Sequence, residues 1–166
     1  TMSHGVNRGV LKNNKKDERD SFINSLIEKN PNIVFDIYGY KNRQPIWSQN
    51  FYDTISLSKM GLNLSRTNSV KYYTSNRISS LVGNGLMTFV DKRTQLNDFF
   101  NSNEVVFYKN IKDLSEKLNF YKNNNDLRKK IAHKGQKKYF YLFNSEAVSA
   151  YILNKIFNIK PIKTLK

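Results

Sequence analysis

The stretch Tyr72–Phe89, YYTSNRISSLVGNGLMTF, joins a short helix to a buried strand, and it decides how the chain is interpreted. The polar run Thr74–Asn76 is typical of a helix start, and the glycines after Val82 are typical of a helix end. The apolar run LMTFV at residues 86–90 is typical of a central strand in a parallel sheet. Arg77 is unexpected, because a cation in the first turn opposes the partial positive charge of a helix N-terminus.

Apolar strands and helical patterns alternate on both sides of this stretch. We expect strands at 32–39, 60–65, 86–90 and 104–108, and helices at 17–30, 51–59, 77–82, 113–121, 126–143 and 144–156. This alternation predicts an α/β fold, a Rossmann-like parallel sheet covered by helices on both faces. Residues 1–166 are expected to form a single domain, with residues 144–166 as its C-terminal helix and tail. Thr1 before Met2 suggests that residues 1–5 include a vector-derived extension.

The composition narrows the function classes. The chain has no cysteine and only two widely separated histidines, so we expect no disulfide and no metal site. No apolar run approaches the roughly 20 residues that span a bilayer, and we expect a cytoplasmic location. The net charge of +15 indicates an anionic partner. Part of that charge reflects a composition rich in Asn, Lys, Ile, Tyr and Phe, which AT-rich codons specify.

A ligand site is expected where the strands of such a sheet end, because ligands of open parallel sheets bind beyond the carboxyl ends of the strands. Cations lie in the loops predicted there, and free N–H groups at a helix N-terminus add to them, which suits a diphosphate. The predicted diphosphate site consists of Asn7, Arg8, Gly9, Ser65, Arg66, Lys71, Thr74, Ser75, Asn76 and Arg77. Tyr38 and Tyr72 are candidates to stack on a base, with Gly39 in the same loop as Tyr38. Alternatively, the glycines supply turns and Thr74–Asn76 only caps the helix.

Three segments resemble a known enzyme family: LNLSR, SNRISSLVGNGLMTFVD and LNDFFNSNEVVFYKNIKDLSEKLNFYKNNNDLRKKIAHKG. They are similar to the C-terminal half of GT-B glycosyltransferases, and more narrowly to group-1 glycosyltransferases of the spore-maturation CgeB type. The matching positions are Arg77, Gly85, Glu104, Tyr108, Asp113, Leu114, Arg128, Ile131, Ala132 and Gly135.

This resemblance implies a domain that binds a nucleotide-sugar donor, in synthesis of cell-surface polysaccharide or lipopolysaccharide. Arg66, Lys71 and Arg77 would stabilise the departing diphosphate without a metal or other cofactor. Ser75 and Asn76 would donate further hydrogen bonds. An N-terminal acceptor-binding domain is missing from the chain and would supply any general base, so no catalytic residue is expected here.

Two positions depart from the family pattern. Aligned on Gly85, the two glutamates of many retaining members correspond to Ser80 and Tyr72, so the contacts to ribose and sugar differ, and we assign Ser80 to the nucleoside and sugar site. A non-catalytic nucleotide-sugar-binding domain is therefore one alternative. A basic nucleic-acid-binding module is the other, although no nucleic-acid motif is present and we expect no nucleic acid as partner.

The segment DLRKKIAHKGQKKYFYLF, residues 126–143, suggests a further partner, the inner face of a membrane. Its lysines lie opposite an apolar face with Leu127, Ile131 and Leu142, and basic amphipathic helices bind anionic membranes. A solvated helix packed on the domain is the interpretation that we prefer.

Overall fold

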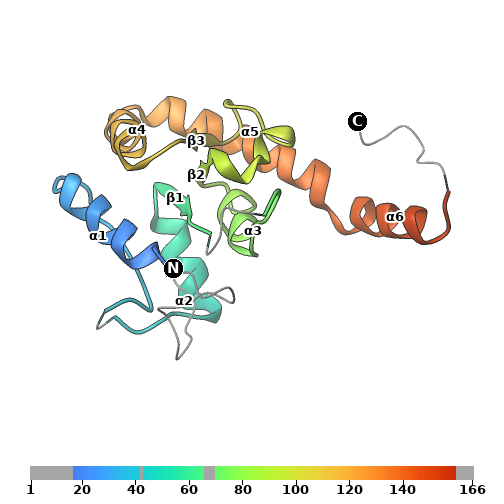
Figure 1. The fold of residues 1–166 in the computed structure, drawn as a ribbon, viewed down its shortest axis with the longest axis horizontal. Helices are drawn as coiled ribbons and strands as arrows, with labels where there is room; N and C mark the ends of the chain where they lie inside the picture. The colour runs from blue at the N-terminus through green and yellow to red at the C-terminus, as the bar shows by residue number, and fades with distance from the viewer. Residues whose placement is uncertain (1–16, 42, 66–69, 160–166) are drawn as a thin grey trace.

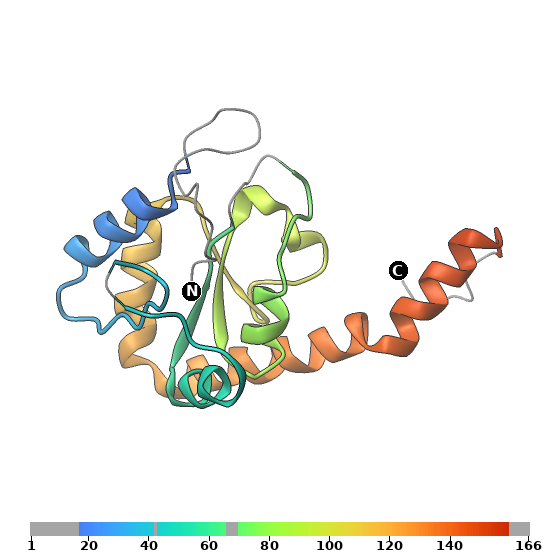
Figure 2. The same cartoon turned by 90° about the horizontal axis from the view of Figure 1, so that it is seen from below.

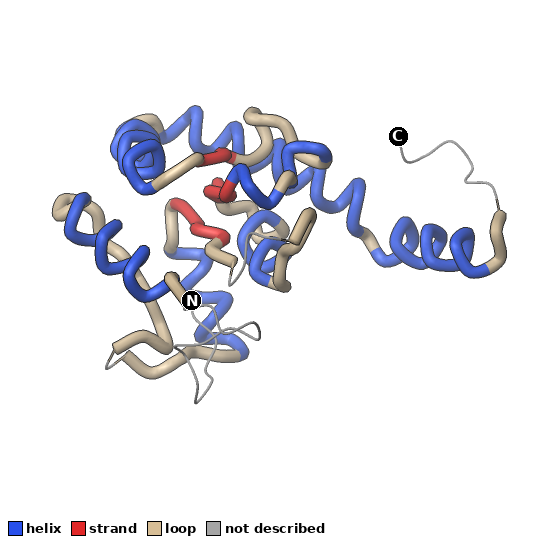
Figure 3. The backbone as a smooth tube through the Cα atoms, viewed as in Figure 1, coloured by secondary structure: helices blue, strands red, loops and turns tan. Residues whose placement is uncertain are grey.

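A computed structural model describes residues 17–41, 43–65 and 70–159 of the chain. Within these residues, the strands β1 (Met60–Asn63), β2 (Met87–Asp91) and β3 (Val106–Tyr108) form a parallel sheet in the order β1-β2-β3. Figure 3 shows the strands at the centre of the molecule with helices around them. The predicted α/β fold with a helix-covered parallel sheet is confirmed.

Helices cover both faces of the sheet (Figures 1 and 2). They are α1 (Arg19–Lys29), α2 (Ser48–Leu57), α3 (Arg77–Val82), α4 (Ile111–Asn123), α5 (Asn125–Phe143) and α6 (Ser145–Ile156), with 3-10 turns at Lys92–Thr94 and Leu96–Asp98. Successive strand residues point to opposite faces. Phe89 therefore packs in a cluster with residues of α1, α4 and α5, whereas Val90 packs with residues of α3.

The strand expected at residues 32–39 is wrong. Residues 34–38 are extended but have no strand partner, and β1 pairs only with β2 within the described residues. The alternation that suggested a strand is nevertheless real: Ile33, Phe35 and Ile37 pack against the core, whereas Val34 is exposed. Alternation reports which side chains are buried, but a strand also requires a neighbouring backbone to accept and donate hydrogen bonds.

The C-terminal helix α6 projects away from the rest of the domain (Figures 1 and 2). The chain turns at Asn144, whose side-chain oxygen accepts a hydrogen bond from the backbone N–H of Ala147 at 2.8 Å. This cap starts α6 as a helix separate from α5. None of the residues of α6 is buried. Along the described ranges, no helix combines the length and the apolar character needed to cross a membrane.

Candidate functional site

Polar side chains gather at the carboxyl ends of the three parallel strands. β1 ends at Asn63, with Ser65 just beyond it; β2 ends at Asp91 and β3 at Tyr108. Asp91 lies beside Tyr108 in the sheet register. All four residues are buried. The parallel sheet thus brings side chains from distant parts of the sequence to one edge, where ligands of such sheets bind.

Several of these buried polar atoms have no hydrogen-bond partner in the part of the chain that the structure describes. They are both side-chain amide atoms of Asn63, the hydroxyl of Ser65 and the hydroxyl of Tyr108. Burial, and then the nearby charge of Asp91, raise the pKa of Tyr108, so its phenol keeps the proton and remains a donor. A buried polar group without a partner costs about 1–3 kcal/mol, and such groups are rare in native proteins. Their concentration at this edge indicates a site for a polar ligand.

The cations near this edge differ in how their charge is balanced. Arg93 binds Asp91 through two nitrogens, with Nη2–Oδ2 at 2.7 Å and Nε–Oδ1 at 3.1 Å. Arg19, the first residue of α1, binds Asp17 in the same way, at 2.7 and 3.0 Å. Each of these two guanidinium groups therefore has a carboxylate partner two residues earlier in the sequence.

Arg77 is different. Its Nη1 donates a hydrogen bond to the carbonyl oxygen of Leu64 at 2.7 Å, and no carboxylate of the described residues forms an ion pair with it. Burial, and then the positive charge of Arg19, lower the pKa of Arg77, although an arginine stays protonated at neutral pH. A half-buried cation beside a second cation produces a positive potential that an anion would relieve.

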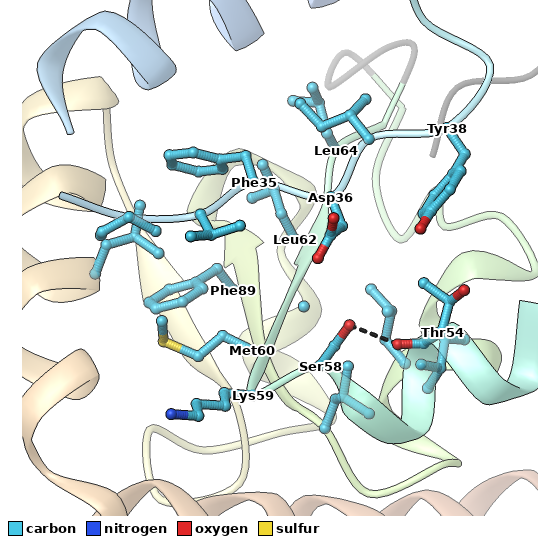
Figure 4. Close-up of a pocket in the computed structure, with 18 of the residues that line it drawn as sticks. Phe35, Asp36, Tyr38, Thr54, Ser58, Lys59, Met60, Leu62, Leu64 and Phe89 are labelled. Atoms are coloured by element: carbon cyan, nitrogen blue, oxygen red, sulfur yellow. Dashed lines mark hydrogen bonds between the residues drawn. The ribbon is translucent and has the colours of Figure 1, made fainter. Parts of the chain in front are cut away.

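Arg77 and Arg19 both line a cavity of about 460 Å³ beside β1. Its other walls come from α1, α2, α3 and the loop residues 32–38, and they are mostly apolar. In Figure 4, the hydroxyl of Tyr38 and the carboxylate of Asp36 point toward the space between that segment and α2. This volume is within the range of about 300–1,000 Å³ for small-molecule sites, which combine apolar walls with a few polar groups.

The structure brings three of the predicted site residues together in this cavity: Tyr38, Arg77 and Ser80. The Ser80 hydroxyl donates to the backbone carbonyl of Asn76 at 3.0 Å. Ser65 lies at the sheet edge described above. Ser75 and Thr74 form local contacts before α3: the Ser75 hydroxyl accepts from the Arg77 N–H at 3.3 Å, and the Thr74 hydroxyl donates to the Ser75 carbonyl at 3.3 Å.

Lys71 and Tyr72 contact Asp98 and do not line the cavity. Lys71 Nζ lies 3.5 Å from an Asp98 oxygen, and the Tyr72 hydroxyl donates to the same carboxylate at 2.5 Å. Tyr72 has a positive φ of 61°. Gly39, at a φ of 71°, donates its N–H to Arg43 O at 3.1 Å and forms a turn. Four further predicted residues lie outside the described residues: Asn7, Arg8, Gly9 and Arg66.

The sequence predictions missed Arg19 and Asn63, and they gave Tyr108 no role. Arg19 stands at the first residue of a helix, the same unusual position that drew attention to Arg77. Asn63 interrupts the apolar run MGLNLS, which is a signal for a polar group inside a sheet. Tyr108 ends a run of apolar residues, and nothing in the sequence shows that its hydroxyl is buried. The sequence also contains an Asp-x-Arg pattern at Asp17 and at Asp91. This local pattern could have predicted the ion pairs of these two aspartates with Arg19 and Arg93.

The helix-covered parallel sheet is that of a Rossmann-like domain, with unpaired buried polar atoms at the carboxyl ends of its strands and a cavity beside β1. Within the described residues, no group of three or more His, Asp or Glu side chains could hold a metal ion.

In a comparison with protein families, a family model described as "Glycosyl transferase-like" matches residues 18–154, most of the chain. The chain belongs to this glycosyl transferase-like family, which confirms the resemblance to glycosyltransferases at that level. Neither the curated proteins nor the solved structures gave a match.

Proposed function

We propose that this domain binds a nucleoside-diphosphate sugar, with the diphosphate at Arg77. The observation that carries the proposal is the Arg77 guanidinium, which is half-buried beside Arg19 and has no carboxylate partner among the described residues. A diphosphate accepts two parallel N–H bonds from a guanidinium and supplies the missing negative charge. Because α3 has only six residues, the guanidinium and not the helix dipole is the main source of positive charge.

The proposed chemistry is stabilisation of the leaving group. The bond between the anomeric carbon of the sugar and the β-phosphate oxygen breaks, and that oxygen keeps the electron pair. Arg77 then binds a more negative diphosphate than in the ground state, which lowers the barrier. A new bond forms between the anomeric carbon and an acceptor hydroxyl, whose proton passes to a general base. In this proposal that base belongs to a separate acceptor-binding domain.

The nucleoside and sugar would occupy the rest of the cavity. Tyr38 is placed to stack on a base or ribose, and Ser80 offers a hydroxyl from α3. Asn63 and Tyr108 do not line the cavity but end β1 and β3, and they would bind polar atoms of a donor that extends to this edge of the sheet, because their side chains lack partners in the described residues. Arg8 and Arg66, outside those residues, stay candidates for phosphate contacts.

The narrower placement in the family is also a proposal. We infer that the chain is the C-terminal, donor-binding half of a GT-B enzyme and works with an N-terminal acceptor domain. The acceptor would belong to a cell-surface polysaccharide or lipopolysaccharide. This inference rests on the motif resemblance.

A thermal-shift panel tests the donor proposal directly. UDP, GDP and their sugars are added to the protein, and at least one nucleoside diphosphate is expected to raise the Tm. At a ligand concentration of about 100 Kd, the stabilisation should be about 2.7 kcal/mol. The absence of any shift with every compound would contradict the proposal. Binding to RNA or DNA that falls steeply with salt, without a nucleotide response, would support the nucleic-acid alternative.

Replacement of Tyr108 by phenylalanine separates ligand binding from folding. The substitution removes a buried hydroxyl that has no partner in the described residues, so the unliganded protein should be as stable or up to about 1 kcal/mol more stable. The affinity for the nucleoside diphosphate should fall about tenfold, because a hydrogen bond to a charged ligand is lost. Urea unfolding measures the stability, and calorimetric titration measures the affinity for the nucleoside diphosphate.

Tyr139→Phe, which removes a tyrosine hydroxyl on α5, is the matched control. A loss of stability above about 1 kcal/mol would show that the hydroxyl has a structural role.

A non-catalytic nucleotide-sugar-binding domain is the second candidate. Ser80 favours it, because a hydroxyl bonded to the Asn76 carbonyl occupies the position of a family glutamate. This candidate predicts binding of a nucleotide sugar without transfer or hydrolysis, even when the acceptor domain is present. Release of the nucleoside diphosphate in that assay would exclude it.

A further inference from the structure

The helix α6 exposes an apolar surface that nothing in the described part of the chain covers. Val148, Ile152 and Ile156 lie four residues apart on one face, and Ile152 and Ile156 are 49% and 64% exposed. Tyr151, 54% exposed, lies beside this face, and Phe157, 66% exposed, follows the last residue of the helix. Contiguous apolar surface of this kind on a soluble domain marks an interaction site. We call these five residues the α6 apolar surface.

A basic surface precedes it on α5. Lys130, Lys134 and Lys137 lie opposite the buried residues of this helix, Lys129 and Lys138 lie at the flanks of its buried side, and no acidic residue occurs between Asp126 and Glu146. In the sequence, lysines also follow α6, at positions 160, 163 and 166. An apolar helix is therefore flanked on both sides by cations.

The apolar face of α5 itself does not provide the interaction surface. Ile131 is only 4% exposed and packs in the core with β2 and β3, as the preferred interpretation of a helix packed on the domain requires, whereas Leu127 is 39% exposed. The lysines of that helix stay exposed or partly exposed. The apolar contribution comes instead from α6, which sequence reasoning had treated only as a terminal helix.

We propose that α6 docks on an anionic lipid bilayer, with its apolar surface among the acyl chains and the α5 lysines at the phosphates. The charge pattern favours this occupant over a second copy. A second copy would place the same lysines near one another, and like charges repel. Anionic lipid surfaces attract basic segments, and each nearby lysine contributes about 1 kcal/mol.

The aromatic residues of this region fit the same occupant. Lys138 Nζ lies 5.6 Å from the Tyr141 ring centroid, and Lys155 Nζ lies 5.7 Å from that of Tyr151. Tyrosine is enriched at the level of lipid headgroups, where its ring is apolar and its hydroxyl is hydrated. Paired lysine and tyrosine side chains on both helices therefore match the polarity gradient of a membrane interface.

Vesicle flotation with the full chain, without nucleotide, tests the proposal. The protein should bind vesicles with about one third phosphatidylglycerol and should not bind pure phosphatidylcholine. The double variant Ile152→Asp/Ile156→Asp should reduce binding at least about tenfold. The triple variant Lys134→Gln/Lys137→Gln/Lys138→Gln should also reduce binding at least about tenfold.

The matched control for the double variant is Leu57→Asp, at an apolar residue that is 86% exposed on α2. The control for the triple variant is Lys29→Gln/Lys109→Gln/Lys112→Gln, which changes the net charge by the same amount at exposed lysines elsewhere. Both controls should bind like the unchanged protein.

Three results would overturn the proposal. One is no binding to either vesicle. Another is binding that survives both the α6 and the α5 variants, or falls equally in the controls. The third is a dimer by analytical ultracentrifugation that the α6 substitutions dissociate, which would assign this surface to a second copy. The Tm of the α6 variant should be unchanged, because α6 has no buried residue. The nucleotide panel reports on the other end of the domain, so the two proposals can fail separately.

Discussion

Replacement of Arg77 by alanine is expected to abolish the thermal stabilisation that a nucleoside diphosphate gives to this domain. Lys59, Lys122 and Arg77 line the cavity without a carboxylate partner among the described residues, but both lysines are exposed, whereas Arg77 is half-buried. A hydrogen bond to a charged group contributes about 1.5–3 kcal/mol, so affinity should fall about 10- to 100-fold. Calorimetric titration with the nucleotide that gives the largest shift measures this change. The variant should also lose some stability without ligand, because the Leu64 carbonyl loses its donor.

Lys92→Ala is the charge-matched control for this experiment. Lys92 is exposed and follows β2 at the same end of the sheet, but it does not line the cavity. Its removal lowers the net charge by the same amount and should change affinity less than about threefold, because exposed charges are screened by salt. If both variants lost affinity equally, general electrostatic attraction and not a diphosphate site at Arg77 would explain the binding. An Arg77→Ala protein with unchanged affinity would contradict the site.

Replacement of Gly135 by alanine is expected to cause the largest loss of stability. Gly135 lies in α5 where this helix crosses the sheet, and an added Cβ would lie 2.1 Å from the backbone oxygen of Glu104. In a helix, alanine is normally favoured over glycine by about 1 kcal/mol. Here the clash with a backbone atom should outweigh that gain, because α5 must move away from a packed core. We expect a net loss of at least about 2 kcal/mol in the free energy of unfolding.

Gly61→Ala is the matched comparison for the clash. The Cβ at this position would lie 2.9 Å from the end of the Leu81 side chain, which can rotate away. The loss should therefore be less than half of that at Gly135. Urea unfolding followed by circular dichroism measures both variants. If the Gly135→Ala protein were as stable as the unchanged chain, the higher helix propensity of alanine would outweigh the clash, and α5 would tolerate the displacement.

The elements that the sequence predicted well are those with a strong local pattern. The strands near 60–65, 86–90 and 104–108 and all six helices are present, with shifted ends. The strand at 32–39 failed for a physical reason: burial of alternate residues is a local property, but strand pairing needs a second backbone. The sequence pattern of one segment does not show whether another segment lies beside it and can pair with it.

The candidate site was predictable in outline because parallel strands bring their carboxyl ends to one edge. That rule alone led to Arg77, and the resemblance added Ser80. It also led to Lys71 and Tyr72, whose side chains contact Asp98 instead, 26 residues after Tyr72. Arg19 and Asn63 went unnoticed because their significance depends on burial and on which neighbours they lack.

The sequence by itself determined the alternation of helices and strands and the membership of a glycosyltransferase family. Only the tertiary structure decided which cations keep an unbalanced charge. Arg19 and Arg93 each pair locally with an aspartate two residues earlier, whereas packing brings Lys71 to Asp98 and leaves Arg77 with the backbone carbonyl of Leu64. The reason is that electrostatic interaction depends on distance and burial, and both are fixed only when distant segments pack together.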